Sequence, residues 1–194
     1  MNCILSICNP LGNSTYSLVL EAVRQINSQK YVLHINRRTL PLMCYILTRA
    51  GVETGFVFEK GNSGPCSIQV NESIVSMDNT GLITEDRAGT LEANVDPNFE
   101  FDRTPYSERD LRGLNKTVDM FCRVKSVEQA EIATAVIFAY DELNACKPDV
   151  SEDDILTNVL NWRIQCTDSK DEVKSSIRGL AMLGWIHPKP SFPF

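Results

Sequence analysis

The sequence has few of the residues that usually build metal sites and disulfide frameworks. Its 194 residues include only two histidines, His34 and His187, and seven cysteines with no C-x-x-C pair among them. Zinc sites need closely spaced ligand pairs, and a disulfide framework needs an even set of cysteines. We therefore expect no metal and no cofactor, and we expect most of the thiols to be reduced and buried as small apolar groups.

Long hydrophobic runs are also missing. No apolar stretch approaches the roughly 20 residues that a helix needs to cross a bilayer. The first twelve residues, MNCILSICNPLG, contain a short apolar stretch without the basic segment that precedes it in a secretory signal. We therefore expect a cytoplasmic protein that does not contact membranes.

Basic residues are scarce in the second quarter of the chain. The formal net charge is −6, but residues 1–50 carry five Lys or Arg against one Glu, a net charge of +4. Residues 51–100 carry two basic residues against nine acids, a net charge of −7. Nucleic-acid binding needs a continuous basic face. The uneven charge favours a protein partner of complementary charge and disfavours nucleic acid.

What is present is the composition of a globular protein, with 43% hydrophobic and 23% charged residues. The clearest boundary lies in residues 94–106, NVDPNFEFDRTPY, where two prolines separate two blocks. We expect one unit over residues 1–98 and a second over 99–194, or a single compact domain. The fold class predicted is mainly α with small antiparallel β, that is, α+β.

The first block has the pattern of a winged-helix unit. Helices are predicted at residues 17–26 and before Gly51, which suits a left-handed cap. A short strand is predicted at residues 55–59, followed by a turn at Gly61 and Gly64-Pro65. A third helix should begin after the N-cap Ser67.

The end of that block predicts a wing. The third helix is expected to face the core with Ile68, Ile74, Val75 and Met77. After Gly81, residues 82–84 should form a strand that shares a sheet with residues 55–59, and a return strand at residues 90–95 would complete a hairpin.

The second block is more plainly helical. The tetrads beginning at Ser107 and Ser126 resemble capping boxes. Residues 132–143 are apolar on nearly all sides, which predicts a central helix. Acids open a further helix at residues 151–154, where the helix dipole favours them. The last helix ends in Leu183-Gly184-Trp185-Ile186, which mirrors Gly81-Leu82-Ile83 and suggests a second winged-helix-like unit.

These motifs resemble those of the YwgA-like bacterial proteins and, more distantly, the Panacea (SocA-like) antitoxin domain. The matching segments are Asn36-Arg37-Arg38-Thr39-Leu40-Pro41-Leu42, Ser63-Gly64-Pro65-Cys66-Ser67 and Gly81-Leu82-Ile83. Pro41-Leu42 stands where the family pattern has Gln-Lys, and Cys66 stands where it has an aromatic residue. The resemblance implies a bacterial or phage winged-helix protein with a regulatory, antitoxin or defence-associated role, and it implies no known chemistry.

The site residues that the sequence favours lie in two turns. Guanidinium groups at Arg37 and Arg38 can pair with carboxylates or phosphates. The turn Gly64, Pro65, Cys66 and Ser67 is the second candidate contact with a partner. The alternatives are a solvated turn at Arg37-Arg38, pure backbone geometry at Gly64-Pro65, and a nucleophilic thiol at Cys66.

No catalytic constellation is evident, so we expect a protein-interaction module and not an enzyme. The acids at residues 141–142 and 152–154 are expected to be solvated helix caps and not acid–base catalysts. A DNA-binding winged-helix regulator is the alternative function. The sequence leaves a homo-oligomer open.

Overall fold

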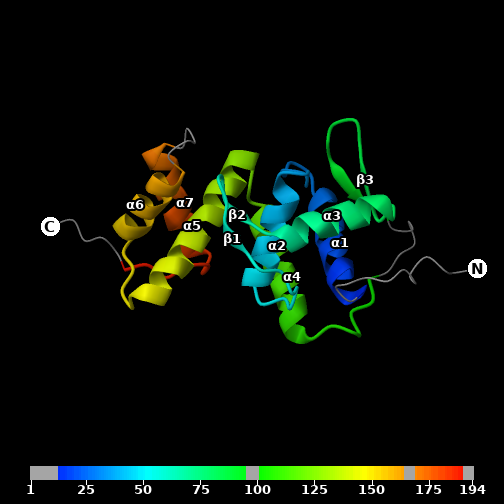
Figure 1. The fold of residues 1–194 in the computed structure, drawn as a ribbon, viewed down its shortest axis with the longest axis horizontal. Helices are drawn as coiled ribbons and strands as arrows, with labels where there is room; N and C mark the ends of the chain where they lie inside the picture. The colour runs from blue at the N-terminus through cyan, green and yellow to red at the C-terminus, as the bar shows by residue number, and fades with distance from the viewer. Residues whose placement is uncertain (1–12, 95–100, 164–168, 190–194) are drawn as a thin grey trace, which may run out of the picture. The chain divides into compact units, whose positions relative to one another are not determined.

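A computed structural model describes residues 13–94, 101–163 and 169–189 of the chain (Figure 1). Their contacts form two compact units. Unit 1 contains the described residues up to 58 and from 67 to 125, and unit 2 contains residues 59–66 and those from 126 onward. The fold is mainly helical with small antiparallel sheets, which confirms the predicted class.

Unit 1 is a helical body with one β-hairpin. Its described elements are α1 (Asn13–Asn27), α2 (Thr39–Arg49), α3 (Ile68–Asn79), β3 (Ile83–Glu85), β4 (Leu91–Ala93) and α4 (Glu108–Phe121). The predicted boundary between residues 98 and 99 would separate α4 from this unit, whereas the contacts group α4 with α1 and α2. The side chains buried between these elements include Ile26, Met43, Leu47, Leu91, Leu114 and Phe121.

A glycine sets the close approach of α4 to the end of α2. A Cβ built on Gly113 would lie 2.7 Å from Val52 Cγ2 and 3.2 Å from the carbonyl oxygen of Ala50. Real Cβ atoms essentially never approach another atom to 2.7 Å, so any larger residue at this position would force Val52 to shift. α2 itself ends as expected, with Gly51 at a φ of 100° immediately after Ala50.

The predicted hairpin is confirmed, but its predicted third strand is wrong. β3 pairs with β4 in an antiparallel sheet of two strands, with Thr84 opposite Glu92. The predicted strand at residues 55–59 does not join this sheet. Instead Asn36 forms a bridge with Thr90, and the backbone N–H of Leu91 donates to the carbonyl of Ile35 at 2.8 Å.

The reason for the error lies in aromatic packing. Side chains alternate between buried and exposed from Glu53 to Val57, as a strand pattern requires. Here the alternation accompanies the packing of aromatic rings and not the pairing of strands. The Phe58 ring packs edge-on against the rings of Tyr45 and Phe56, with centroids 5.2 Å and 6.4 Å away. Only Glu59 enters a strand, and its partner is Cys66.

Unit 2 combines three helices with a small hairpin. Its described elements are β1 (Glu59–Lys60), β2 (Pro65–Cys66), α5 (Val127–Cys146), α6 (Glu152–Trp162) and α7 (Lys170–Met182). α5 contacts α6, α7 and β2, and its residues from Ala130 to Ile137 are all buried. The predicted central helix is therefore confirmed.

A serine is the N-cap of each helix of this unit. Ser126 accepts a hydrogen bond from the backbone N–H of Gln129. Ser151 and Ser169 each form a complete capping box, in which the serine and an acid three residues later satisfy each other's backbone N–H. Ser107 does the same at the start of α4 in unit 1. Each of these local signals can be read in the sequence.

The two matching glycine motifs end their helices in the same way. Gly81 and Gly184 have φ values of 69° and 68°. In each case the following residue donates back into the last turn, Leu82 to Met77 O at 2.8 Å and Trp185 to Leu180 O at 2.9 Å. The chain after α7 then differs from a wing: within the described residues, Lys189 forms a parallel bridge with Ser151.

Candidate interaction surface

Arg37 is held by acids of its own unit. Its Nε donates to Glu85 Oε2 at 2.6 Å, and its Nη2 donates to Asp78 Oδ2 at 2.7 Å. The hydrogen bond with Asp78 and then that with Glu85 raise the pKa of the guanidinium. The side chain therefore links the start of α2 to the end of α3 and to β3. These bonds give Arg37 a role inside unit 1, in addition to the partner contact predicted for it.

Arg38 occupies the cap position of α2 and is exposed. Its backbone N–H donates to Asn36 Oδ1 at 2.9 Å, and the N–H of Thr39 donates to the same oxygen at 3.0 Å. Asn36 thus satisfies the first N–H groups of the helix in the way that capping side chains do.

The second predicted turn is divided between the two units. Gly64, Pro65 and Cys66 belong to unit 2, whereas Ser67 belongs to unit 1. Gly64 O accepts from the N–H of Gly61 at 3.0 Å and closes the hairpin, Pro65 is buried, and Cys66 is exposed in β2. Ser67 caps α3 as predicted, accepting from the N–H of Val70 at 3.4 Å.

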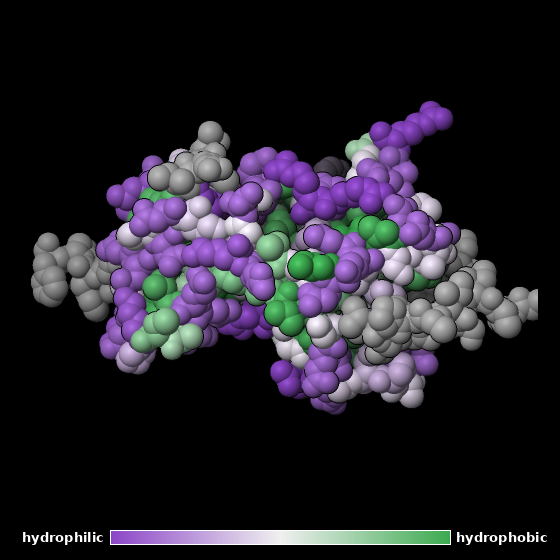
Figure 2. Space-filling model, viewed as in Figure 1, coloured by the Kyte–Doolittle hydropathy of each residue, from purple (hydrophilic) through white to green (hydrophobic). Residues whose placement is uncertain are grey.

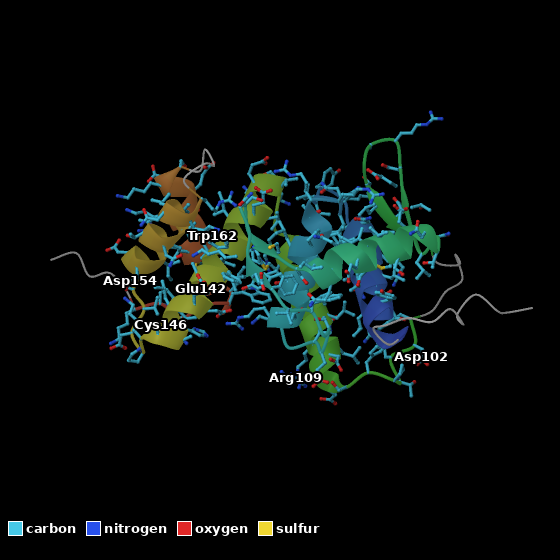
Figure 3. The ribbon with its side chains drawn as sticks, in the orientation of Figure 1. Asp102, Arg109, Glu142, Cys146, Asp154 and Trp162 are labelled. Carbon is cyan, nitrogen blue, oxygen red and sulfur yellow. The ribbon has the colours of Figure 1, made fainter. Side chains whose placement is uncertain are left out.

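The hairpin is attached to the helices of unit 2 by side chains that are not among the predicted site residues. Trp162 Nε1 donates to Gly61 O at 2.7 Å (Figure 3). Lys60 pairs with Glu142 at 3.1 Å, and its Nζ lies 4.7 Å from the centroid of the Trp162 ring, a cation–π contact. The partners lie 82 and 101 positions apart in sequence, so no local pattern could have indicated them.

A buried ion pair completes this attachment. Arg163 is only 3% exposed and Glu131 8%. The guanidinium donates to the backbone carbonyl of Ser63 and, at 3.5 Å, to Glu131 Oε2. Charges that are removed from water in this way are stable only when they are paired. Arg163 therefore links the Ser63 carbonyl of the hairpin to α5 and to the end of α6.

The acids singled out in the second block act as helix caps or surface ion pairs. Asp154 accepts from the N–H of Ser151 at 2.9 Å and lies 2.6 Å from Lys147 Nζ. These hydrogen bonds, first that from Lys147 and then those from Ser151, hold the pKa of Asp154 below its usual range. The prediction of capping acids is confirmed at residues 152–154 and wrong at Asp141 and Glu142, which lie within α5 and begin no helix.

The outer face of α3 differs from its prediction. Val70, Ile74 and Met77 form the buried face, whereas Ile68 and Val75 are 73% and 57% exposed. Residues seven apart lie on the same side of a helix, and here that side is opposite the core. The periodicity was read correctly as helical, but Ile68 and Val75 were assigned to the wrong face.

This outer face combines apolar and acidic groups. Figure 2 shows apolar side chains at the surface over α3, with polar groups around them. Glu72 is exposed between Ile68 and Val75, and α3 contains no Lys or Arg. We call Ile68, Glu72 and Val75 the α3 surface.

The described part of the chain gives two further findings. It contains no group of three or more His, Cys, Asp or Glu side chains placed to hold a metal ion. None of the helices within it is both long enough and apolar enough to pass through a membrane. Comparison of the chain with protein-family models, with curated proteins and with solved structures found no match.

Proposed function

We propose that this chain is a protein-interaction module, not an enzyme, and that it contacts a protein partner through the α3 surface. The observation that carries the proposal is the pair of exposed branched side chains, Ile68 and Val75, one heptad apart on a helix whose other face already packs into the core. Apolar anchors at such spacing are how a helix binds a groove on a partner.

The charge of the α3 surface indicates the partner's chemistry. Glu72 lies between the two apolar anchors, so a complementary groove would carry apolar residues and a Lys or Arg. Arg37 and Arg38 remain candidate contacts at the start of α2, and Gly64, Pro65, Cys66 and Ser67 at the hairpin and the cap of α3. A regulatory or antitoxin-like subunit in the cytoplasm fits such a module.

The topology of unit 1 supports winged-helix scaffolding for this surface. Three helices precede the two-stranded β3–β4 hairpin, and an isolated bridge between Asn36 and Thr90 joins the start of α2 to the hairpin. In a DNA-binding winged helix, the third helix would enter the major groove. The charged residues of α3 are Glu72 and Asp78, which would repel phosphates, so DNA binding is the weaker alternative.

The test is affinity capture from a bacterial lysate followed by reconstitution. The chain carrying Ile68→Ser and Val75→Ser is compared with the wild type and with Met182→Ser, a matched change at an exposed residue of α7. We expect one protein to be retained by the wild type and by Met182→Ser and lost from the double variant, and its purified form to bind with at least about tenfold lower affinity to that variant.

Two outcomes would contradict the proposal. One is capture of the same proteins by all three chains, or of none by any of them. The other is a gel shift with duplex DNA whose affinity falls steeply with salt and is lost in the double variant, which would favour the DNA-binding alternative.

A further inference from the structure

Tyr31 adopts a backbone conformation that tyrosine rarely takes. Its φ is 66°, and among the described residues it is the only one other than glycine with a positive φ. In this left-handed region the Cβ crowds the neighbouring carbonyl, so glycine or asparagine is the usual choice. The turn that follows α1 would form at lower cost with either of them.

The side chain does not compensate for this cost within the chain. The residue is 91% exposed, more than any other large apolar residue described. A tyrosine that packed into the core would offset backbone strain through buried area, and this ring does not. Strain of this kind is found at binding and catalytic sites, where the surrounding structure maintains it.

The loop around Tyr31 is fixed by hydrogen bonds. Lys125 Nζ donates to the carbonyl oxygen of Tyr31 at 3.0 Å. Two residues later, the N–H of Leu33 donates to Val124 O at 3.4 Å, and at the start of the loop the N–H of Gln29 donates to Ile26 O at 3.1 Å. The ring therefore stands on an anchored loop at the end of α4, which lowers the entropy lost when it meets a partner.

The charges beside the ring are mainly positive. Lys30 and Lys125 are exposed next to it, and His34 is exposed at the end of the same loop. Arg123 is bonded to Asp119 through two hydrogen bonds, at 3.1 Å and 2.9 Å, so that pair adds little net charge. An exposed aromatic ring whose sequence neighbour is Lys30, and whose backbone carbonyl is bonded by Lys125, is complementary to a segment that carries both apolar and carboxylate side chains.

We propose that Lys30, Tyr31 and Lys125 form a second contact surface, which binds an acidic peptide segment of a protein partner. Tyrosine is enriched among the residues that dominate binding energy, because its ring buries much area at little entropic cost. Nucleic acid could also stack on the ring, but it needs a continuous basic face for many phosphate contacts, whereas a short acidic segment can be matched by the two lysines, so the acidic polypeptide is the better match. This surface shares no residue with the α3 surface and does not depend on it.

The test combines binding and stability in the same variants. The probe is a fluorescein-labelled short peptide of alternating Glu and Leu, measured by anisotropy against a matched Lys-and-Leu peptide and against oligothymidine. We expect the wild type to prefer the Glu-and-Leu peptide, and Tyr31→Gly and Tyr31→Asn to lose at least about tenfold in affinity. Tyr31→Phe should retain binding, and Lys30→Glu should weaken it.

Unfolding separates loss of the surface from loss of the fold. Gly and Asn accept the left-handed conformation. The melting temperatures of Tyr31→Gly and Tyr31→Asn should therefore be no lower than that of the wild type, and up to about 2 °C higher. The Ile68→Ser, Val75→Ser variant should bind the peptide normally. The proposal is overturned if the wild type shows no preference for the acidic peptide, if Tyr31→Gly binds it unchanged, or if only oligothymidine binding depends on Tyr31.

Discussion

Replacing Arg163 with methionine should destabilise unit 2 by about 3 kcal/mol. Removing one member of a buried ion pair costs about 3–5 kcal/mol, because the other charge stays buried. The separation of 3.5 Å between Arg163 and Glu131 is longer than the 2.7–2.9 Å of a tight charged hydrogen bond. The lower end of that range is therefore appropriate. The same change also removes the donor to the Ser63 carbonyl.

The chain offers a reporter confined to the unit that is perturbed. Its two tryptophans, Trp162 and Trp185, both belong to unit 2. Urea unfolding followed by tryptophan fluorescence therefore measures unit 2, while circular dichroism measures both units. With a slope of about 1.5 kcal/mol per molar urea, a loss of 3 kcal/mol lowers the midpoint by about 2 M.

Arg178→Met is the matched control. Arg178 is an exposed arginine of the same unit, 3.9 Å from Glu152, and a pair of this kind contributes about 0–1 kcal/mol. The double variant Glu131→Gln, Arg163→Met should cost less than the sum of its single changes, because the two residues are coupled. A midpoint for Arg163→Met close to that of the wild type, or equal to that of Arg178→Met, would refute the assignment of the pair as the anchor of the hairpin.

Three further predictions concern other parts of the fold. Gly113→Ala should destabilise unit 1 by about 1–3 kcal/mol through the clash with Val52, whereas Gly179→Ala, with no atom within 4 Å of the new Cβ, should stabilise unit 2 by about 0.5–1 kcal/mol in urea unfolding. Burial raises the pKa of the Cys44 thiol from 9.0 to about 12. The contribution of the buried thiol to stability is therefore complete below pH 9 and is lost as the pH rises toward 12. Urea midpoints should fall more steeply over this range in the wild type than in Cys44→Ala. The pKa of Asp154 is lowered in the folded protein, so its contribution to stability is present above the ordinary pKa of 3.8 and is lost as the pH falls through the folded pKa. Acid unfolding followed by tryptophan fluorescence should therefore show a shallower loss of stability in Asp154→Asn than in the wild type.

Helix positions and their ends could be predicted because their causes are local. Ser67, Ser126 and Ser151 each bond to a backbone N–H three residues later, and a serine before an apolar periodic run indicates that bond. Gly81 and Gly184 end α3 and α7 because glycine takes the left-handed conformation easily. Each of these interactions involves residues only a few positions apart, so the local sequence is enough to predict where the helix starts or ends.

The face of α3 could not be assigned in the same way. Its apolar residues lie on two opposite sides, and periodicity alone does not say which side the core will cover. The predicted inner face contains Ile68 and Val75 together with Ile74 and Met77, although the first pair lies on the other side of the helix. A helix with apolar residues on both sides is itself a signal of a second contact.

The candidate site was harder to predict than the fold, because its surroundings are contributed by distant segments. Arg37 was selected as a partner contact from its position in a turn, but Asp78 and Glu85, which lie forty and more positions away, bond to its guanidinium. Tyr31 was passed over because the sequence does not reveal that its φ is positive or that its ring is exposed.

The insertion of residues 59–66 into unit 2 has a consequence for synthesis on the ribosome. These residues emerge before α4 and well before α5, α6 and α7, so translation at about 5–20 residues per second leaves them without their helical partners for several seconds. During that interval residues 13–58 and 67–125 can fold together as unit 1 only if residues 59–66 remain as an unpaired loop. A nascent chain arrested after residue 125 should therefore protect α1 to α4 from protease while the peptide bonds around Gly61 and Gly64 remain open to cleavage.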